Sequence, residues 1–196
     1  MIETGNLLGK ILSVFDNTIY ELVSGFISAG MTRFMIFITF WGSELAVTIL
    51  TVMILLSAFI FKKKKYLRYA LLITVNIIIG ALLNFILKQL FQRQRPDLLK
   101  LVEISGYSFP SGHSMSSMIF YGFIIFLCLR YAKHWSKHLV AAILSLLVFM
   151  IGISRIYLGV HYASDVLGGF IIGLAWLVFY IRLAERFGFL KRKEPV

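Results

Sequence analysis

The chain has 196 residues, of which 59% are hydrophobic and 15% are charged. A soluble domain carries about 25% charged residues, so this composition indicates a membrane protein, and its length indicates one compact domain. The net charge of +11 is gathered at the ends of apolar runs. That placement argues against a nucleic-acid partner and is typical of the cytoplasmic ends of membrane spans. The single cysteine, Cys128, excludes an intrachain disulfide.

Residues 1–43 differ from the rest of the chain. Apolar residues recur there at spacings of three and four, as at Ile11, Phe15, Ile19 and Leu22, and polar residues such as Asp16 lie between them. This pattern predicts an amphipathic helix that lies in the membrane interface. A weak first span whose charges face the bundle is the alternative. A break near Gly30 is expected to start a second piece that leads into the first clear span.

Five apolar runs follow, each of about 16 to 19 residues, close to the ~20 that a spanning helix needs. Backbone amides in lipid must be satisfied within their own segment, so these runs are helices. We therefore predict an all-α fold: an integral membrane bundle of five to six transmembrane helices. Residues 44–185 form the catalytic bundle, and 186–196 form a basic cytoplasmic tail. The runs are 44–61, 69–87, 114–129, 139–154 and 166–181.

The basic clusters predict the orientation of the bundle. Cations follow the first run at 62–68, separate the third and fourth runs at 130–138, and follow the last run from Arg182. The positive-inside rule places these segments in the cytoplasm. The loops at 89–112 and 155–165 then lie on the extracytoplasmic face of the cell membrane. Three short polar strings fall in these loops and are expected to meet there.

The first string runs from Lys88 to Arg95 and Pro96. Lys88 and Arg95 are seven residues apart, so both can face one side of a helix end. Arg95 can bind two phosphate oxygens, and Lys88 adds a point charge. Pro96 is expected to end the helix. The alternative is a pair of cations that snorkel at the membrane border.

The second string is Pro110-Ser111-Gly112-His113, directly before an apolar run. Ser111 is a candidate N-cap residue, and Gly112 allows an anion to approach the backbone. The first amides of the helix would point at that anion. His113 lies where it could protonate a leaving oxygen. A capped helix with an interfacial histidine is the alternative.

The third string contains Ser154-Arg155, His161 and Asp165. His161 and Asp165 are four residues apart, which predicts neighbours on one helix face. The carboxylate can hold the Nδ1 proton and leave Nε2 free to attack phosphorus, while Arg155 stabilises charge on the phosphoryl oxygens. A structural His–Asp pair that caps the last helix is the alternative.

Together the strings predict a membrane-embedded phosphatase that acts on a lipid phosphate. Two histidines and a carboxylate could in principle bind zinc. Three cations that converge on the same place would repel a dication, and no acidic cluster suits magnesium. We therefore predict no metal and no other cofactor.

The strings resemble the three signature motifs of the type-2 phosphatidic acid phosphatase superfamily: K-x6-R-P, P-S-G-H and S-R-x5-H-x3-D. Every specified position is matched between Lys88 and Asp165. The resemblance implies metal-independent hydrolysis of phosphate monoesters or diphosphates. It implies His161 as nucleophile, Asp165 as its partner and His113 as general acid. It assigns phosphate binding to Lys88, Arg95, Ser111, Gly112 and Arg155.

Several alternatives stay open at this point. A phosphotransferase would use the same site with a second lipid as acceptor, and an anionic-lipid transporter would place polar groups at mid-membrane. The soluble vanadate-dependent haloperoxidases of the same superfamily do not fit five apolar spans. The partners expected are the bilayer and a lipid phosphate, for a monomeric chain. The substrate is left open among phosphatidylglycerol phosphate, phosphatidic acid, undecaprenyl diphosphate and a lipid A phosphate.

Overall fold

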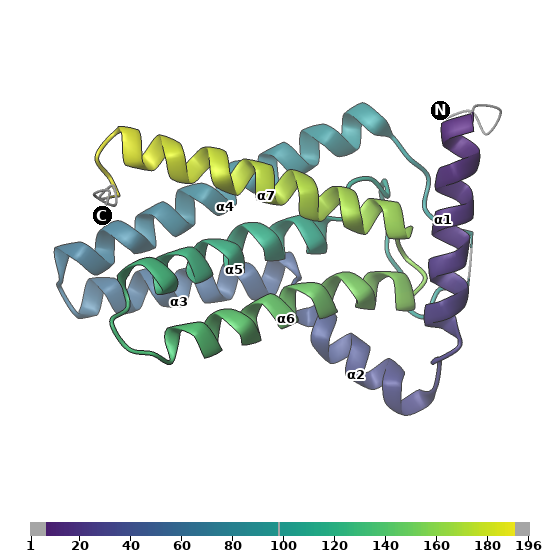
Figure 1. The fold of residues 1–196 in the computed structure, drawn as a ribbon, viewed down its shortest axis with the longest axis horizontal. Coiled ribbons are helices and arrows are strands. Elements are labelled where there is room, and N and C mark those ends of the chain that lie inside the picture. Colours follow the sequence, from purple (N-terminus) through teal and green to yellow (C-terminus); the bar gives the residue numbers. More distant parts are fainter. Residues whose placement is uncertain (1–6, 98, 191–196) are drawn as a thin grey trace.

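The structure is a computed structural model that describes residues 7–97 and 99–190. This part of the chain contains helices and no strand, which confirms the all-α prediction. The helices between residues 44 and 186 lie roughly along one axis, and the helix at residues 7–24 crosses their ends (Figure 1). The helices are α1 (Leu7–Ser24), α2 (Ala29–Phe40), α3 (Glu44–Ile60), α4 (Lys64–Phe91), α5 (Gly112–Tyr131), α6 (Lys137–Tyr157) and α7 (Ala163–Arg186).

Four helices in the described part of the chain are each long and apolar enough to cross a bilayer: α4, α5, α6 and α7. Helix α3 has 17 residues, a length of about 26 Å against the ~30 Å of a hydrocarbon core. It follows α2 across a bend of 46°, and the two together are long enough for a fifth crossing. The predicted span at 44–61 is therefore only the second part of a bent pair.

Helix α5 lies at the centre of the bundle and contacts α3, α4, α6 and α7. Two glycines bring α7 close to it. A Cβ atom built on Gly169 would lie 2.8 Å from the carbonyl oxygen of Ser111, and one on Gly173 would lie 3.1 Å from that of Met115. Any larger side chain would push the two helices apart. These glycines therefore set the close approach between the starts of α5 and α7.

A polar residue in the middle of the bundle, Asn76 of α4, has a structural explanation. Its side chain is fully buried. It donates to the carbonyl oxygen of Ile119 (3.3 Å) and accepts from the indole N–H of Trp176 (2.9 Å). These bonds link α4 to α5 and α7 and satisfy the amide. Asn76 is thus a satisfied packing residue, and it gives no support to a transport path at mid-membrane.

Helix α1 lies across the end of the bundle where α4 and α6 end and α5 and α7 begin (Figure 1). Its residues Ile19 and Tyr20 pack against Ile156 and Ala163 at that end. Several of its other apolar residues, including Ile11 and Leu22, are exposed. Helix α1 is not among the candidate spans of the described residues. That it lies in the membrane interface stays a prediction.

Two sequence-based boundaries need correction. The break before α2 lies at residues 25–28, so Gly30 is already helical. The basic cluster after the first apolar run is also partly helical, because α4 begins at Lys64. Lysine and arginine are good helix formers and extend their charged ends to water. Residues 191–196 of the predicted basic tail lie outside the described residues.

Candidate active site

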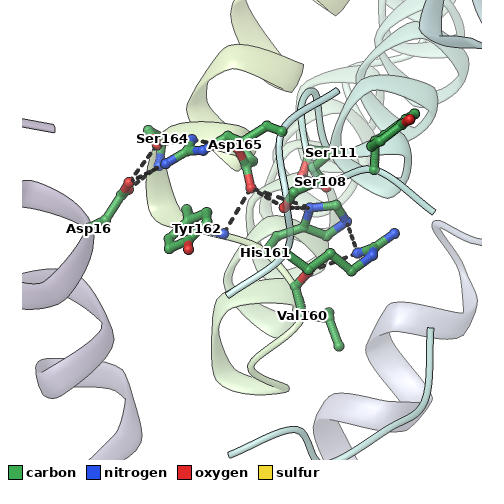
Figure 2. A network of polar contacts seen from close by, with 12 residues as sticks. Asp16, Ser108, Ser111, Val160, His161, Tyr162, Ser164 and Asp165 are labelled. Carbon is green, nitrogen blue, oxygen red and sulfur yellow. Dashed lines mark hydrogen bonds and ion pairs between the residues drawn. The ribbon is translucent and has the colours of Figure 1, made fainter. Parts of the chain in front are cut away.

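The three polar strings meet at the end of the bundle that α1 covers. His161 lies in the short connection between α6 and α7 and is 3% exposed. Figure 2 shows Ser108 between its ring and Asp165 at the start of α7. Its Nδ1 atom is 3.3 Å from Ser108 Oγ and 3.6 Å from Asp165 Oδ2. The predicted pair on one helix face is therefore wrong in its geometry, because His161 precedes α7.

Asp165 is the third residue of α7 and is fully buried. Its carboxylate accepts hydrogen bonds from the Tyr162 N–H (3.0 Å), the Ser108 hydroxyl (2.5 Å) and Arg93 Nη1 (2.6 Å). Such donors satisfy a charge that would otherwise be costly to bury. The bond to Tyr162 also caps the first turn of α7. Asp165 thus shapes the helix start and the surroundings of His161 at once.

The neighbours of His161 assign its tautomer. Arg95 Nη1 lies 3.2 Å from Nε2, and a guanidinium can only donate. Nε2 is therefore the acceptor, and Nδ1 carries the proton. The Nδ1–H group then donates towards Ser108, whose hydroxyl donates to Asp165 (Figure 2). Asp165 thus acts on the imidazole mainly through Ser108, because 3.6 Å is too long for a direct hydrogen bond.

His161 is neutral at neutral pH. Its pKa is lowered to about 4, mainly by burial and also by the nearby Arg155 and Arg95, while the Asp165 carboxylate opposes them. A neutral ring with its proton on Nδ1 has a free lone pair on Nε2. This is the form that a nucleophilic imidazole requires.

Arg155 is the most unusual cation of the site. It lies in the last turn of α6 and is 2% exposed. Its Nη1 donates to Thr39 Oγ1 (2.7 Å). Its Nε and Nη2 are buried and have no hydrogen-bond partner among the described residues. Each unsatisfied buried donor costs about 1–3 kcal/mol, so this guanidinium is suited to an anion that supplies the acceptors.

Lys88 and Arg95 are held by loop carbonyl groups. Lys88 Nζ donates to the Tyr107 carbonyl (2.5 Å), and Arg95 donates to those of Val160 and Gly106. The prediction that both face one side of a helix end is wrong. Helix α4 ends at Phe91, and Gln92 takes a left-handed conformation. Pro96 therefore plays no part in ending the helix.

The second string is placed as expected, with one difference. His113 lies in the first turn of α5, within direct electrostatic range of His161, Arg155, Arg95 and Lys88. Ser111 occupies the N-cap position, but its side chain makes no capping bond. Its hydroxyl instead accepts from Ser114 (3.0 Å). Gly112 lies against Asn84, where an added Cβ would be 3.4 Å from the amide oxygen.

Four residues of the site were not predicted from the sequence. They are Ser108 between ring and carboxylate, Arg93 on Asp165, and Asp16 and Ser164, which contact Arg93. Arg93 lies within the first string, between Lys88 and Arg95, so the sequence could have indicated it as a candidate site residue. The amphipathic pattern places Asp16 on the polar face of its helix, which is expected to face water. In the structure Asp16 is instead buried, with 3% of its surface exposed. No group of three or more His, Cys, Asp or Glu suited to a metal ion occurs in the described residues.

The comparisons with known proteins agree with this architecture. Residues 65–189 match the model of the PAP2 superfamily. The chain is similar to phosphatidylglycerophosphatase B of Bacillus subtilis, with 45% identity over 102 residues. That match covers 51% of this chain and 49% of the relative. Undecaprenyl-diphosphatase of Sulfolobus acidocaldarius is 26% identical over 186 residues, which cover 93% and 84% of the two chains.

A solved structure resembles the whole bundle. The crystal structure of a transmembrane PAP2 type phosphatidylglycerolphosphate phosphatase from Bacillus subtilis aligns with a TM-score of 0.83 and 31% identity. The alignment covers 97% of this chain and 92% of that one. The resemblance in the three strings is thereby confirmed, and the long apolar helices are those of a multi-pass membrane protein. The chain belongs to the PAP2 superfamily.

Proposed function

We propose that the chain is a membrane lipid phosphatase that transfers a phosphoryl group from a lipid phosphate to His161 and then to water. The observation that carries the proposal is the buried guanidinium of Arg155. Its two unpaired nitrogen atoms lie in electrostatic range of the neutral His161 ring. A phosphoryl group bound there would satisfy the donors and place phosphorus beside Nε2.

In the first step, a bond forms between Nε2 and phosphorus while the bond from phosphorus to the lipid oxygen breaks. His113 donates a proton to the leaving oxygen. The positive charge that develops on the ring is stabilised through Ser108 by Asp165. In the second step, a bond forms between the oxygen of water and phosphorus while the bond from Nε2 to phosphorus breaks. His113 accepts the proton of the attacking water, the imidazole returns to its neutral form, and inorganic phosphate leaves.

Arg95 has two successive partners in this scheme. In the structure its Nη1 donates to Nε2 of His161. An incoming phosphate is a stronger acceptor than imidazole because it is charged. Arg95 therefore moves its donors to the phosphate oxygens and releases the Nε2 lone pair at the moment it is needed. Lys88, Ser111 and the amide of Gly112 complete the phosphate-binding set.

The names of the relatives narrow the substrate class. The relatives and the solved structure described above are named for phosphatidylglycerol phosphate or undecaprenyl diphosphate, whereas a further relative, 33% identical over 111 residues, is a lipid A 4'-phosphatase of Bacteroides thetaiotaomicron. We propose that this chain takes one of the first two lipids. The test is release of inorganic phosphate by the purified protein from both lipids, phosphatidic acid and a lipid A phosphate, with and without EDTA. We expect release that is insensitive to EDTA and fastest with one of the first two lipids. Transfer to an added acceptor lipid without release of phosphate would contradict hydrolysis.

We further propose that the site faces the extracytoplasmic side. Lys64 and Arg68 at the start of α4, and Arg182 near the end of α7, lie at the opposite end of the bundle (Figure 1), where the positive-inside rule places the cytoplasm. The test uses single cysteines in a Cys128→Ser background. A membrane-impermeant thiol reagent added to intact cells should label Lys100→Cys and spare Lys133→Cys. Both positions are exposed, and the reverse labelling would contradict this orientation.

A further inference from the structure

A buried ion-pair chain connects α1 with the catalytic carboxylate. Asp16, in the middle of α1, is 3% exposed. Its Oδ2 accepts from Arg93 Nη2 (2.9 Å), and Nη1 of the same guanidinium donates to Asp165 Oδ1 (2.6 Å). One arginine thus bridges two buried carboxylates, one on α1 and one beside His161.

The same aspartate also binds the start of α7. Its Oδ1 accepts from the backbone N–H of Ser164 (2.7 Å), and its Oδ2 accepts from the Ser164 hydroxyl (2.8 Å) (Figure 2). The first N–H groups of a helix lack partners within the helix, and a carboxylate there is favourable. Asp16 therefore fixes the backbone one residue before Asp165.

The surroundings add a further contact to the Arg93 guanidinium. A cavity of about 540 Å³ lies between α1 and the end of α4, and Asp16, Arg93 and Tyr162 line part of it. The Arg93 guanidinium crosses this region, stacked 4.1 Å above the Tyr162 ring. Three contacts therefore hold Arg93 beside Asp165: the carboxylate of Asp16, the hydroxyl of Ser164 and the ring of Tyr162.

We propose that Asp16 is a positioning residue for phosphoryl transfer, acting through Arg93 and Ser164 on Asp165 and so on the ring of His161. The proposal rests on the proposed function. Asp165 binds Ser108 and Arg93 with different oxygen atoms. Without Asp16, Arg93 keeps a single carboxylate partner and is free to draw Asp165 away from Ser108. The imidazole then loses its alignment although every residue that touches the substrate remains.

The test is steady-state phosphate release by full-length Asp16→Asn in detergent. Asparagine keeps the size and one acceptor for Ser164, but it removes the charge that holds Arg93. We expect kcat to fall ~10- to 100-fold, as for a small misplacement of reacting groups, with KM changed less than about twofold because no substrate contact is lost. Glu21→Gln is the matched control: it removes an exposed carboxylate from the same helix and should keep the parent kinetics.

Two further variants separate positioning from mere structural support. Asp16→Glu keeps the charge and should recover part of kcat relative to Asp16→Asn. Combining Asp16→Asn with Arg93→Gln should cost less than the product of the two single effects, because both act on Asp165. Additive losses, or Asp16→Asn with the parent kcat, would overturn the proposal. If Asp16→Asn is not recovered as folded protein, Asp16→Glu and Arg93→Lys take its place. A lower kcat with KM changed less than about twofold would support the proposal, and the parent kcat in both variants would overturn it.

His161→Ala is measured in the same assay. If it keeps the parent activity, the proposed function itself fails. If it is inactive while Asp16→Asn is unchanged, only the role of Asp16 fails.

Discussion

Replacing His161 with alanine is expected to abolish phosphate release, with kcat/KM at least about 10³-fold below the parent. The reason is that the imidazole is the group that bonds to phosphorus in the proposed mechanism, and no other neutral base shares its contacts with Ser108 and Arg95 within the described residues. The measurement is the initial rate of phosphate release by detergent-purified protein at saturating and limiting substrate.

The matched control is His134→Ala. His134 is an exposed histidine in the connection between α5 and α6, at the other end of the bundle. It should keep the parent rate, and both variants should keep the parent thermal midpoint to within a few degrees. Parent-like activity in a folded His161→Ala protein would refute the nucleophile assignment.

The pH profile tests the same residue in the unmodified chain. The nucleophile is the unprotonated ring, and burial lowers the pKa of His161 to about 4. Lowering the pH therefore protonates the ring only near pH 4, whereas an ordinary histidine becomes protonated near pH 6.5. After allowance for ionisation of the substrate, the acid limb of kcat/KM should fall near pH 4. A limb near 6.5 would mean that the reacting imidazole is solvated.

Replacing Arg155 with methionine is expected to lower phosphate release by ~10²- to 10³-fold and to raise the thermal midpoint. The loss of rate follows because a buried donor aimed at phosphoryl oxygens acts where the dielectric is low. The gain in stability follows because the substitution removes two buried donors that have no partner among the described residues. Each such donor costs about 1–3 kcal/mol of folding free energy, and methionine is an apolar side chain of similar length. One kcal/mol corresponds to roughly 2–4 °C in a chain of this size.

Orthovanadate, which mimics the transferred group, sharpens this test. At 100 times its Kd a ligand stabilises a protein by about 2.7 kcal/mol, so vanadate should raise the midpoint of the parent but not of Arg155→Met. Arg182→Met removes an exposed cation from the far end of α7 and should resemble the parent in both measurements. A variant that is less stable than the parent and still active would contradict the anion-binding role.

The position of the N-terminal helix illustrates what an amphipathic pattern does and does not specify. The spacing of Ile11, Phe15 and Ile19 predicted a helix, and α1 confirms it. The pattern also placed Asp16 on a polar face, but it could not say what that face meets. In the structure the face turns towards Arg93 and Ser164, so its carboxylate is buried. Periodicity describes one helix, whereas burial depends on its partners.

The path of the chain after α4 illustrates the same limit. Proline is a strong stop signal, so the sequence predicts that the helix ends at Pro96. The helix ends five residues earlier, at Phe91, and the next residue, Gln92, takes a left-handed conformation that is uncommon for a residue other than glycine. This earlier end is what frees Arg93 and Arg95 to turn in different directions, one towards Asp165 and one towards His161.

By itself the sequence determined the all-helical membrane bundle, the superfamily and the three strings that supply two histidines and three cations. Lipid forces apolar runs to be helices, and alternating spans bring every second loop to one side, so these conclusions need no coordinates. Only the tertiary structure decided that Ser108 lies between His161 and Asp165, that Arg155 has two donors without a partner among the described residues, and that Asp16 reaches the site. Those contacts join distant segments, and their geometry depends on how the loops and α1 pack against the bundle end.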